Sequence, residues 1–270
     1  VASREATVLA TADAGKSWSQ QKPGTKGGRL LAVAATDASR VWAVGYQRLQ
    51  DNGEQDRGLV LASRDGGATW MRQRLPNGLS PFRVAFADAR HGWLLAGNMD
   101  HSSGYHVLAT ADGGANWRVS YSTQLKLTGL DAVGAKECWV VGGVEHPQSG
   151  VVLRTSDGGR RWQVQTDVSS EHLLDVSFPD ARHGWAVGLA GTVVATSDGG
   201  ATWSAQDPGG DFTLRQVSFN DAQHGWACIG LQALLATVDG GQSWSVVRPT
   251  DGREVITGLA TADSASVAGQ

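Results

Sequence analysis

The sequence has little of several features that define whole classes of protein. Only 2 of its 270 residues are cysteine, and Cys138 and Cys228 fall at non-equivalent positions of different repeats, so we expect no disulfide between them. No run of about 18 apolar residues is present, and the first residues lack the basic, apolar and small segments of a signal peptide. We therefore expect neither a transmembrane helix nor a signal peptide in this chain.

Net charge is also small. Asp and Glu number 26 against 23 for Lys and Arg, a formal net charge of −3, so nothing global attracts the chain to nucleic acid or to an anionic membrane. We expect no nucleic-acid partner. Glycine is abundant at 36 residues and tryptophan reaches 11, which is typical of a turn-rich globular β protein. A length of 270 residues fits one such domain.

One octet recurs six times along the chain with little variation. Each copy begins with Thr or Ser, has Asp at its third position and Gly at its fifth, and ends with Trp, as in TSDGGATW. Repetition of this kind is the signature of a repeat architecture. The copies occupy Thr11–Trp18, Ser63–Trp70, Thr110–Trp117, Thr155–Trp162, Thr196–Trp203 and Thr237–Trp244.

A second motif lies between consecutive octets and completes the repeat. It contains Trp followed by apolar residues and Gly, as in DARHGWAVG, and occurs at 37–45, 88–97, 134–142, 180–188 and 221–230. A short β-type run precedes each copy, and the motif itself forms the second strand. A third run leads into the octet, and a fourth begins at the octet's Trp. Each repeat therefore predicts four short strands, A to D, which form one blade of a β-propeller.

The two ends of the chain predict how the blades close into a ring. The chain begins at a strand C, with ATVLATADAGKSW, and finishes at strands A and B, with ITGLATADSASVAGQ. Pairing of the N- and C-terminal strands would complete the last blade and remove the exposed edges. The sequence thus predicts an all-β, six-bladed β-propeller in a single domain over 1–270, with blades at about 28–75, 80–120, 126–166, 171–206, 212–248, and 254–270 plus 1–20.

The octet is predicted to form the tight turn between strands C and D. Its Asp can accept hydrogen bonds from backbone N–H groups two or three residues on, and its Gly permits a positive φ. The Trp that follows buries a large apolar face. No metal-ligand spacing is present, and we predict neither a metal nor a cofactor. Because they recur at fixed positions, we interpret six aspartates as structural: Asp13, Asp65, Asp112, Asp157, Asp198 and Asp239.

The octets match the Asp box, also called the bacterial neuraminidase repeat. Their alternation with the second motif resembles the photosystem II stability and assembly factor family and its bacterial relatives, over nearly the whole chain. The resemblance implies a non-enzymatic scaffold in an extracytoplasmic compartment, whether periplasmic, lumenal or secreted. It also implies a protein partner, such as a subunit of a membrane complex, that is held during assembly.

Residues outside the repeat indicate where a partner binds. In a propeller the B-to-C and D-to-A loops lie on one face and the Asp boxes on the other. The B-to-C connections of the first three complete blades are the long ones, at 46–58, 98–106 and 143–150. Basic residues gather in the D-to-A connections near them. We predict that an acidic segment of a partner binds there, through Arg29, Arg72, Arg74, Arg83, Lys126, Tyr46, Tyr105 and His146. The alternative is ordinary solvated loop charge.

A glycoside hydrolase of the sialidase or glucanase type, with carbohydrate as its ligand, is the other interpretation. A sialidase needs a nucleophilic tyrosine, but all three tyrosines are expected in loops and none on a channel-lining A strand. Other hydrolases need two carboxylates that face each other across a cleft. The candidates are Asp131 and Asp175 on A strands of adjacent blades, with Glu171 and Glu254 at strand entries.

Overall fold

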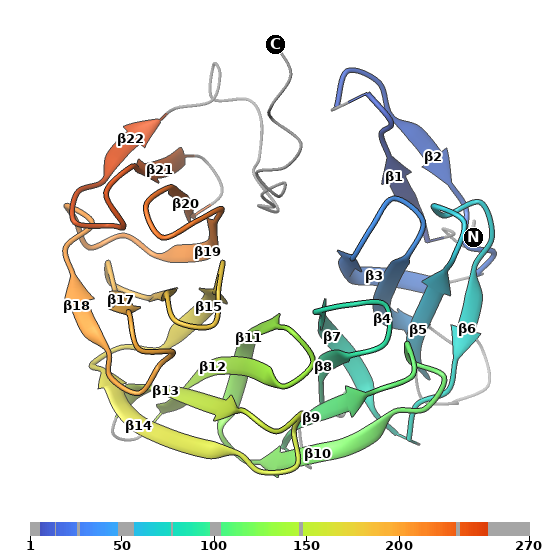
Figure 1. The fold of residues 1–270 in the computed structure, drawn as a ribbon, viewed down its shortest axis with the longest axis horizontal. Helices are drawn as coiled ribbons and strands as arrows, with labels where there is room; N and C mark the ends of the chain where they lie inside the picture. Colours follow the sequence, from blue (N-terminus) through green and yellow to red (C-terminus); the bar gives the residue numbers. More distant parts are fainter. Residues whose placement is uncertain are drawn as a thin grey trace. The chain divides into compact units, whose positions relative to one another are not determined.

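The computed structural model describes residues 6–13, 15–25, 28–47, 57–76, 78–97, 104–145, 148–230 and 233–247. Their regular structure consists of strands β1 to β22, without a helix (Figure 1). None of these segments is therefore an apolar helix of membrane-spanning length. The chain packs as two compact units, Val1–Gln124 with Gly158–Arg160 and Leu125–Asp157 with Arg161–Gln270.

The first unit contains a two-stranded sheet and two four-stranded antiparallel sheets. The small sheet pairs β1 (Val8–Ala10) with β2 (Ser19–Gln21). Each strand of the larger sheets pairs with the next along the chain, as predicted for strands A to D. Blade 1 consists of β3 (Gly28–Ala35), β4 (Val41–Gln47), β5 (Arg57–Ser63) and β6 (Met71–Gln73), and blade 2 of β7 (Ser80–Phe86), β8 (Gly92–Gly97), β9 (Tyr105–Thr110) and β10 (Arg118–Thr123).

The second unit contains three further four-stranded sheets of the same order. Blade 3 consists of β11 (Lys126–Val133), β12 (Glu137–Glu145), β13 (Gln148–Thr155) and β14 (Gln163–Ser169). Blade 4 consists of β15 (Leu173–Ser177), β16 (Gly184–Gly188), β17 (Val193–Thr196) and β18 (Ser204–Gln206). Blade 5 consists of β19 (Leu214–Phe219), β20 (Gly225–Ile229), β21 (Ala233–Thr237) and β22 (Ser245–Val247).

This strand order confirms the predicted fold class. The described residues form six sheets of the blade type, five with four strands and one with two, as a six-bladed β-propeller requires. Residues 251–270 lie outside the described part of the chain, and so does the predicted pairing of the two ends. That closure and the single-domain boundaries stay predictions.

Each A strand carries a β-bulge at the same point of its pairing with strand B. The register shifts between Leu30 and Ala32 in β3, and at the equivalent places in the other A strands, between Pro81 and Arg83, Leu127 and Gly129, Leu173 and Asp175, and Leu214 and Gln216. A bulge redirects the side chains that follow it. The residue after the bulge is Ala32, Arg83, Gly129, Asp175 or Gln216, so this position varies widely in charge.

Aromatic stacks fill the seams between neighbouring blades within each unit. In seam 1/2, between blades 1 and 2, Trp42 of β4 stacks on Phe86 of β7 with ring centroids 3.6 Å apart. The Asp-box residue Trp117 meets Phe86 edge-on at 5.8 Å. The same three-ring stack recurs in seams 3/4 and 4/5, as Trp139, Phe178 and Trp203 and as Trp185, Phe219 and Trp244. These tryptophans therefore pack between blades, whereas Trp18 is 59% exposed.

The strands are longer than the motifs suggested, which corrects the placement of all three tyrosines. Tyr46 lies on β4, Tyr105 begins β9 and Tyr121 lies on β10, so none is in a loop. The reason is that ladder pairing continues beyond the motif, as far as Gln47 opposite Arg57 and Gly97 opposite Tyr105. The connections at 46–58, 98–106 and 143–150 are correspondingly shorter than predicted.

Candidate functional site

The Asp-box turns share one hydrogen-bonding pattern, seen in the copy at Ser63–Trp70. The hydroxyl of Ser63 donates to Oδ1 of Asp65 and accepts the N–H of Gly67. The carboxylate accepts the N–H of Thr69 at 2.8 Å and its hydroxyl at 2.5 Å. The acceptor therefore reaches four residues on, not the two or three expected, because Gly66 and Gly67 both have positive φ and lengthen the turn.

These hydrogen bonds keep the Asp-box carboxylates ionised. A hydroxyl four residues on, donated by Ser17, Thr69 or Ser243, is the main cause that lowers the pKa of Asp13, Asp65 and Asp239 to about 2. A carboxylate with such a pKa and three hydrogen bonds from its own turn is poorly suited to give or take a proton near neutral pH. The turns are thus structural in their chemistry.

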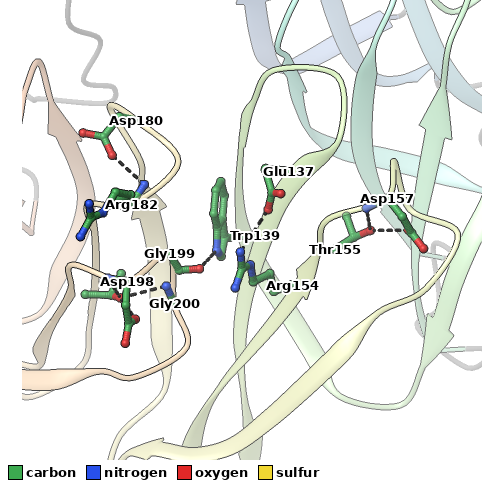
Figure 2. A network of polar contacts seen from close by, with 11 residues as sticks. Glu137, Trp139, Arg154, Thr155, Asp157, Asp180, Arg182, Asp198, Gly199 and Gly200 are labelled. Carbon is green, nitrogen blue, oxygen red and sulfur yellow. Dashed lines mark hydrogen bonds and ion pairs between the residues drawn. The ribbon is translucent and has the colours of Figure 1, made fainter.

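The Asp boxes also accept hydrogen bonds from the preceding blade. In seam 1/2 the carbonyl of Gly113 accepts the indole N–H of Trp42 at 3.1 Å and the amide of Gln73 at 2.7 Å. In seam 3/4 the indole of Trp139 donates to the carbonyl of Gly199 at 2.9 Å (Figure 2). These turns therefore join neighbouring blades, which gives the motif a structural reason to recur.

Asp131 and Asp175, the candidate acids of a hydrolase, are engaged by the backbone of the next blade. The Oδ2 atom of Asp131 accepts the N–H of Phe178 at 2.7 Å, and Oδ2 of Asp175 accepts the N–H of Val217 at 3.1 Å. Blades 3 and 4 approach closely here, because a Cβ added at Gly129 would lie 2.7 Å from Cα of Asp175. Both carboxylates thus link neighbouring blades.

The environment of Asp131 differs from that of the Asp boxes. Burial raises the pKa of Asp131 to about 6, against the effect of the two N–H donors from Phe178 and Ala132. Burial, together with the charge of Asp131, also raises the pKa of the free thiol Cys138. Burial and the charge of Asp175 raise the pKa of Cys228 to about 11. These thiols are protonated and buried near neutral pH, which makes them unreactive.

The remaining hydrolase candidates are Glu171 and Glu254. The carboxylate of Glu171 accepts a hydrogen bond from the amide of Gln148, at the start of β13. Glu254 lies outside the described residues. Among the residues that the structure describes, no group of three or more His, Cys, Asp or Glu side chains is placed to hold a metal ion.

The predicted partner-binding residues of blade 1 lie together at the B-to-C end of its sheet. Arg29 is exposed on β3 and pairs in register with Tyr46 on β4. Arg72 of β6 reaches across the sheet and donates to Oε1 of Gln47 at 3.0 Å and to the carbonyl of Gly58 at 3.2 Å. Arg74 is exposed in the connection after β6. Arg29 and Arg72 thus lie on strands and only Arg74 of these three arginines lies in a loop, which corrects the prediction that all three belong to D-to-A loops.

The other predicted binding residues are distributed over blades 2 and 3. In blade 2, Arg83 is half-buried on β7, and the ring of Phe82 meets Tyr105 edge-on at 6.1 Å. Lys126 is exposed at the start of β11 in the second unit. His146 lies outside the described residues.

One basic group at the Asp-box end was missed by the sequence analysis. Arg40, Arg64 and Arg90 line a common cavity in seam 1/2. The signal was present in the repeats, because Arg40 occupies the position that is His91, His183 or His224 in three other copies.

The fold has clear counterparts among solved structures. YCF48 bound to D1 peptide is 19% identical, with a TM-score of 0.65, over 89% of this chain and 74% of that chain. YCF48 from Cyanidioschyzon merolae has the same identity and TM-score, over 89% and 78% of the two chains. The GH74 enzyme of Niastella koreensis is 12% identical with a TM-score of 0.66, over 91% of this chain but 45% of its own. At such identities the similarity shows a shared fold.

The sequence of the chain also matches a protein-family model. No curated protein sequence matches the chain. The family model described as photosynthesis system II assembly factor YCF48 matches residues 67–167 and 162–252, which together are more than half of the chain. These residues include four complete Asp-box octets and the blades that they join. The chain therefore belongs to the photosynthesis system II assembly factor YCF48 family.

Proposed function

We propose that this protein is a non-catalytic assembly factor that holds a segment of a partner protein. The family match over residues 67–167 and 162–252 carries the proposal. One structure of the same fold is YCF48 bound to D1 peptide. The engagement of Asp131 and Asp175 by backbone N–H groups is a further reason to favour binding over hydrolysis.

The partner segment proposed is acidic and belongs to a subunit of a membrane complex, met in an extracytoplasmic compartment. Support comes from the B-to-C end of blade 1, where Arg29 and Arg74 are exposed and have no ion-pair partner within the described part of the chain. Tyr46 beside Arg29 adds an amphipathic ring of the kind enriched at protein interfaces. Complementary charge of this type gives specificity and speeds association.

A charge-reversal experiment tests the proposed face. The double variant Arg29→Glu, Arg74→Glu should weaken capture of an acidic peptide from a membrane-complex subunit at least about tenfold, and more strongly at low salt. The matched control is Arg161→Glu, Arg182→Glu, which changes charge equally at exposed positions on the Asp-box side. Equal weakening by both double variants, or none by the first, would show that this face is not the binding face.

A second assay tests the non-catalytic part of the proposal. The wild-type protein should release no sugar from a panel of β-glucans and sialosides. Hydrolysis that is present in the wild type and absent in Asp175→Asn would contradict the proposal and restore the hydrolase alternative. The peptide-binding result would remain a separate measurement.

A further inference from the structure

A cavity of about 360 Å³ opens in seam 1/2 at the Asp-box end of the first unit. Blade 1 lines it with Arg40, Trp42, Ala62 and Arg64, and blade 2 contributes Arg90 and Asp112. It lies on the side of the blades opposite the face proposed above for the partner segment. The cavity is therefore a separate site.

Arginines outnumber acidic residues in the lining of this cavity. The guanidinium of Arg40 is 2.8 Å from Asp37, and Nε of Arg90 donates to the carbonyl of Ala111. Arg64 is exposed and has no polar partner among the residues that the structure describes. Asp112 is already engaged in its own Asp-box turn by Thr110 and Asn116. The lining thus contains three arginines and one aspartate, and the guanidinium of Arg64 is uncommitted within the described part of the chain.

Seam 3/4 shows what occupies the equivalent place when the cavity is filled. Arg154 pairs in register with Trp139, just as Ala62 pairs with Trp42. Its guanidinium lies 5.9 Å from the indole centroid and 3.4 Å from Oε2 of Glu137 (Figure 2). A long side chain thus fits over the seam tryptophan. In seam 1/2 the small Ala62 leaves this space open.

The two seams also carry opposite charges two residues before the strand-B tryptophan. Glu137 precedes its strand-B tryptophan by two residues in seam 3/4, and Arg40 holds that position in seam 1/2. Seam 4/5 has Ala195 at the tryptophan partner position and no arginine in the places of Arg40, Arg64 and Arg90, where it has His183, Ser197 and Gln223. The three arginines are therefore not needed to build a seam.

We propose that this cavity binds a carboxylate, carried by an acidic side chain or chain terminus of a polypeptide or by a free organic acid. A guanidinium presents paired N–H donors that match the two oxygens of a carboxylate, and three arginines line the cavity. The volume accommodates an extended chain of the length of Arg154 in the equivalent seam. In seam 3/4 the arginine over the tryptophan pairs with a glutamate of the protein itself. In seam 1/2 the arginines of the cavity would pair with a carboxylate of the ligand.

The test is an NMR titration of the whole protein that follows the indole N–H of Trp42 and the side-chain N–H of Arg64. The probe peptide Ac-Ala-Gly-Glu, with a free C-terminus, should shift these signals and saturate. Ac-Ala-Gly-Gln-NH2, which lacks both carboxylates, should not. Tighter binding of the peptide than of glutarate would indicate a polypeptide source, and the reverse a free organic acid. Inorganic phosphate should bind more weakly than either.

Variants make the test specific to the cavity. Ala62→Met fills the space without changing charge, and Arg64→Gln removes the uncommitted cation; each should weaken the probe at least about tenfold. Ala195→Met is the matched control in seam 4/5 and should bind as the wild type does. Unchanged binding by Ala62→Met, or phosphate binding as tight as the peptide, would overturn the proposal. Because Arg29 and Arg74 are not involved, failure here leaves the proposed partner face untouched.

Discussion

Seams 1/2 and 3/4 are built from the same parts and differ in what fills them. Both contain a strand-B tryptophan, a strand-A phenylalanine and an Asp-box tryptophan, with the first two rings 3.6–3.7 Å apart. In seam 3/4 Arg154 lies over the tryptophan and pairs with Glu137, whereas seam 1/2 has Ala62 and Arg40 at these positions. The aromatic stack, which both seams share, therefore holds the blades together, whereas the residues around it vary in size and charge.

The largest expected effect comes from removing the shared tryptophan. Trp42→Ala and Trp139→Ala should each lower the free energy of unfolding by about 3–5 kcal/mol, because a buried stacked indole and its hydrogen bond to the next Asp box are lost. Urea unfolding followed by circular dichroism measures this. Trp18→Ala is the control, with a small effect expected for a side chain that is 59% exposed. A loss in one seam alone would mean that the stacks are not equivalent.

The next effect concerns one strand-A position, which is polar in seam 3/4 and apolar in seam 1/2. Asp131 accepts the N–H of Phe178 in seam 3/4, whereas Ala34 occupies its place in seam 1/2. Asp131→Ala should cost about 1–3 kcal/mol, because the N–H of Phe178 is left without that acceptor. Urea unfolding is again the measurement, and Asp211→Ala is a control at an exposed carboxylate in the same unit. A cost no larger than that of the control would show that Asp131 does not link the blades.

Asp131 should also give the stability a distinctive dependence on pH. Its folded pKa of about 6 lies above the ordinary value of 3.8, so between pH 4 and 6 the folded state binds more protons than the unfolded state. This group therefore makes the protein less stable as pH rises through that range. The stability difference between wild type and Asp131→Asn should fall from pH 4 to 6 and be level above it.

The Asp-box carboxylates should make the protein more stable as pH rises, the opposite of Asp131, and should do so at lower pH. With a folded pKa of about 2, Asp65 contributes stability above pH 4 that is lost as pH falls from 4 toward 2. Asp65→Asn should therefore flatten the acid limb and leave the interval from pH 4 to 6 unchanged. The same slope change from Asp131→Asn and Asp65→Asn would contradict the contrast between the two environments.

The smallest stability effect is expected from the side chain that fills seam 3/4. Arg154→Ala removes an ion pair that is partly exposed and should cost about 1 kcal/mol or less. The triple variant Glu137→Arg, Arg154→Ala, Ser156→Arg places the three arginines and the alanine of seam 1/2 in seam 3/4, since Arg182 already stands in the place of Arg90. It should gain binding of Ac-Ala-Gly-Glu in the titration described above. Arg154→Ala alone should not gain it, because Glu137 would then repel a carboxylate.

Much of the architecture could be predicted from the repeat because its determinants are local. The octet contains the hydroxyl, the carboxylate and the glycines that satisfy one turn, and the spacing of the turns gives the number and order of the strands between them. The tyrosines were misplaced because ladder pairing continued past the motif, which no residue pattern marks. The role of Asp131 was also missed as a link between blades, since its partner, the N–H of Phe178, lies 47 residues further on.

The sequence by itself therefore determined the number of octets, the order of strands within a blade and the structural character of the Asp boxes. Each of these depends on residues a few positions apart. Only the tertiary structure decided which seam is open and which is filled. That outcome depends on a strand-C residue, two turns of one blade and a turn of the next, such as Ala62, Arg64, Arg40 and Arg90. These residues meet because antiparallel pairing and blade stacking bring distant segments to one edge.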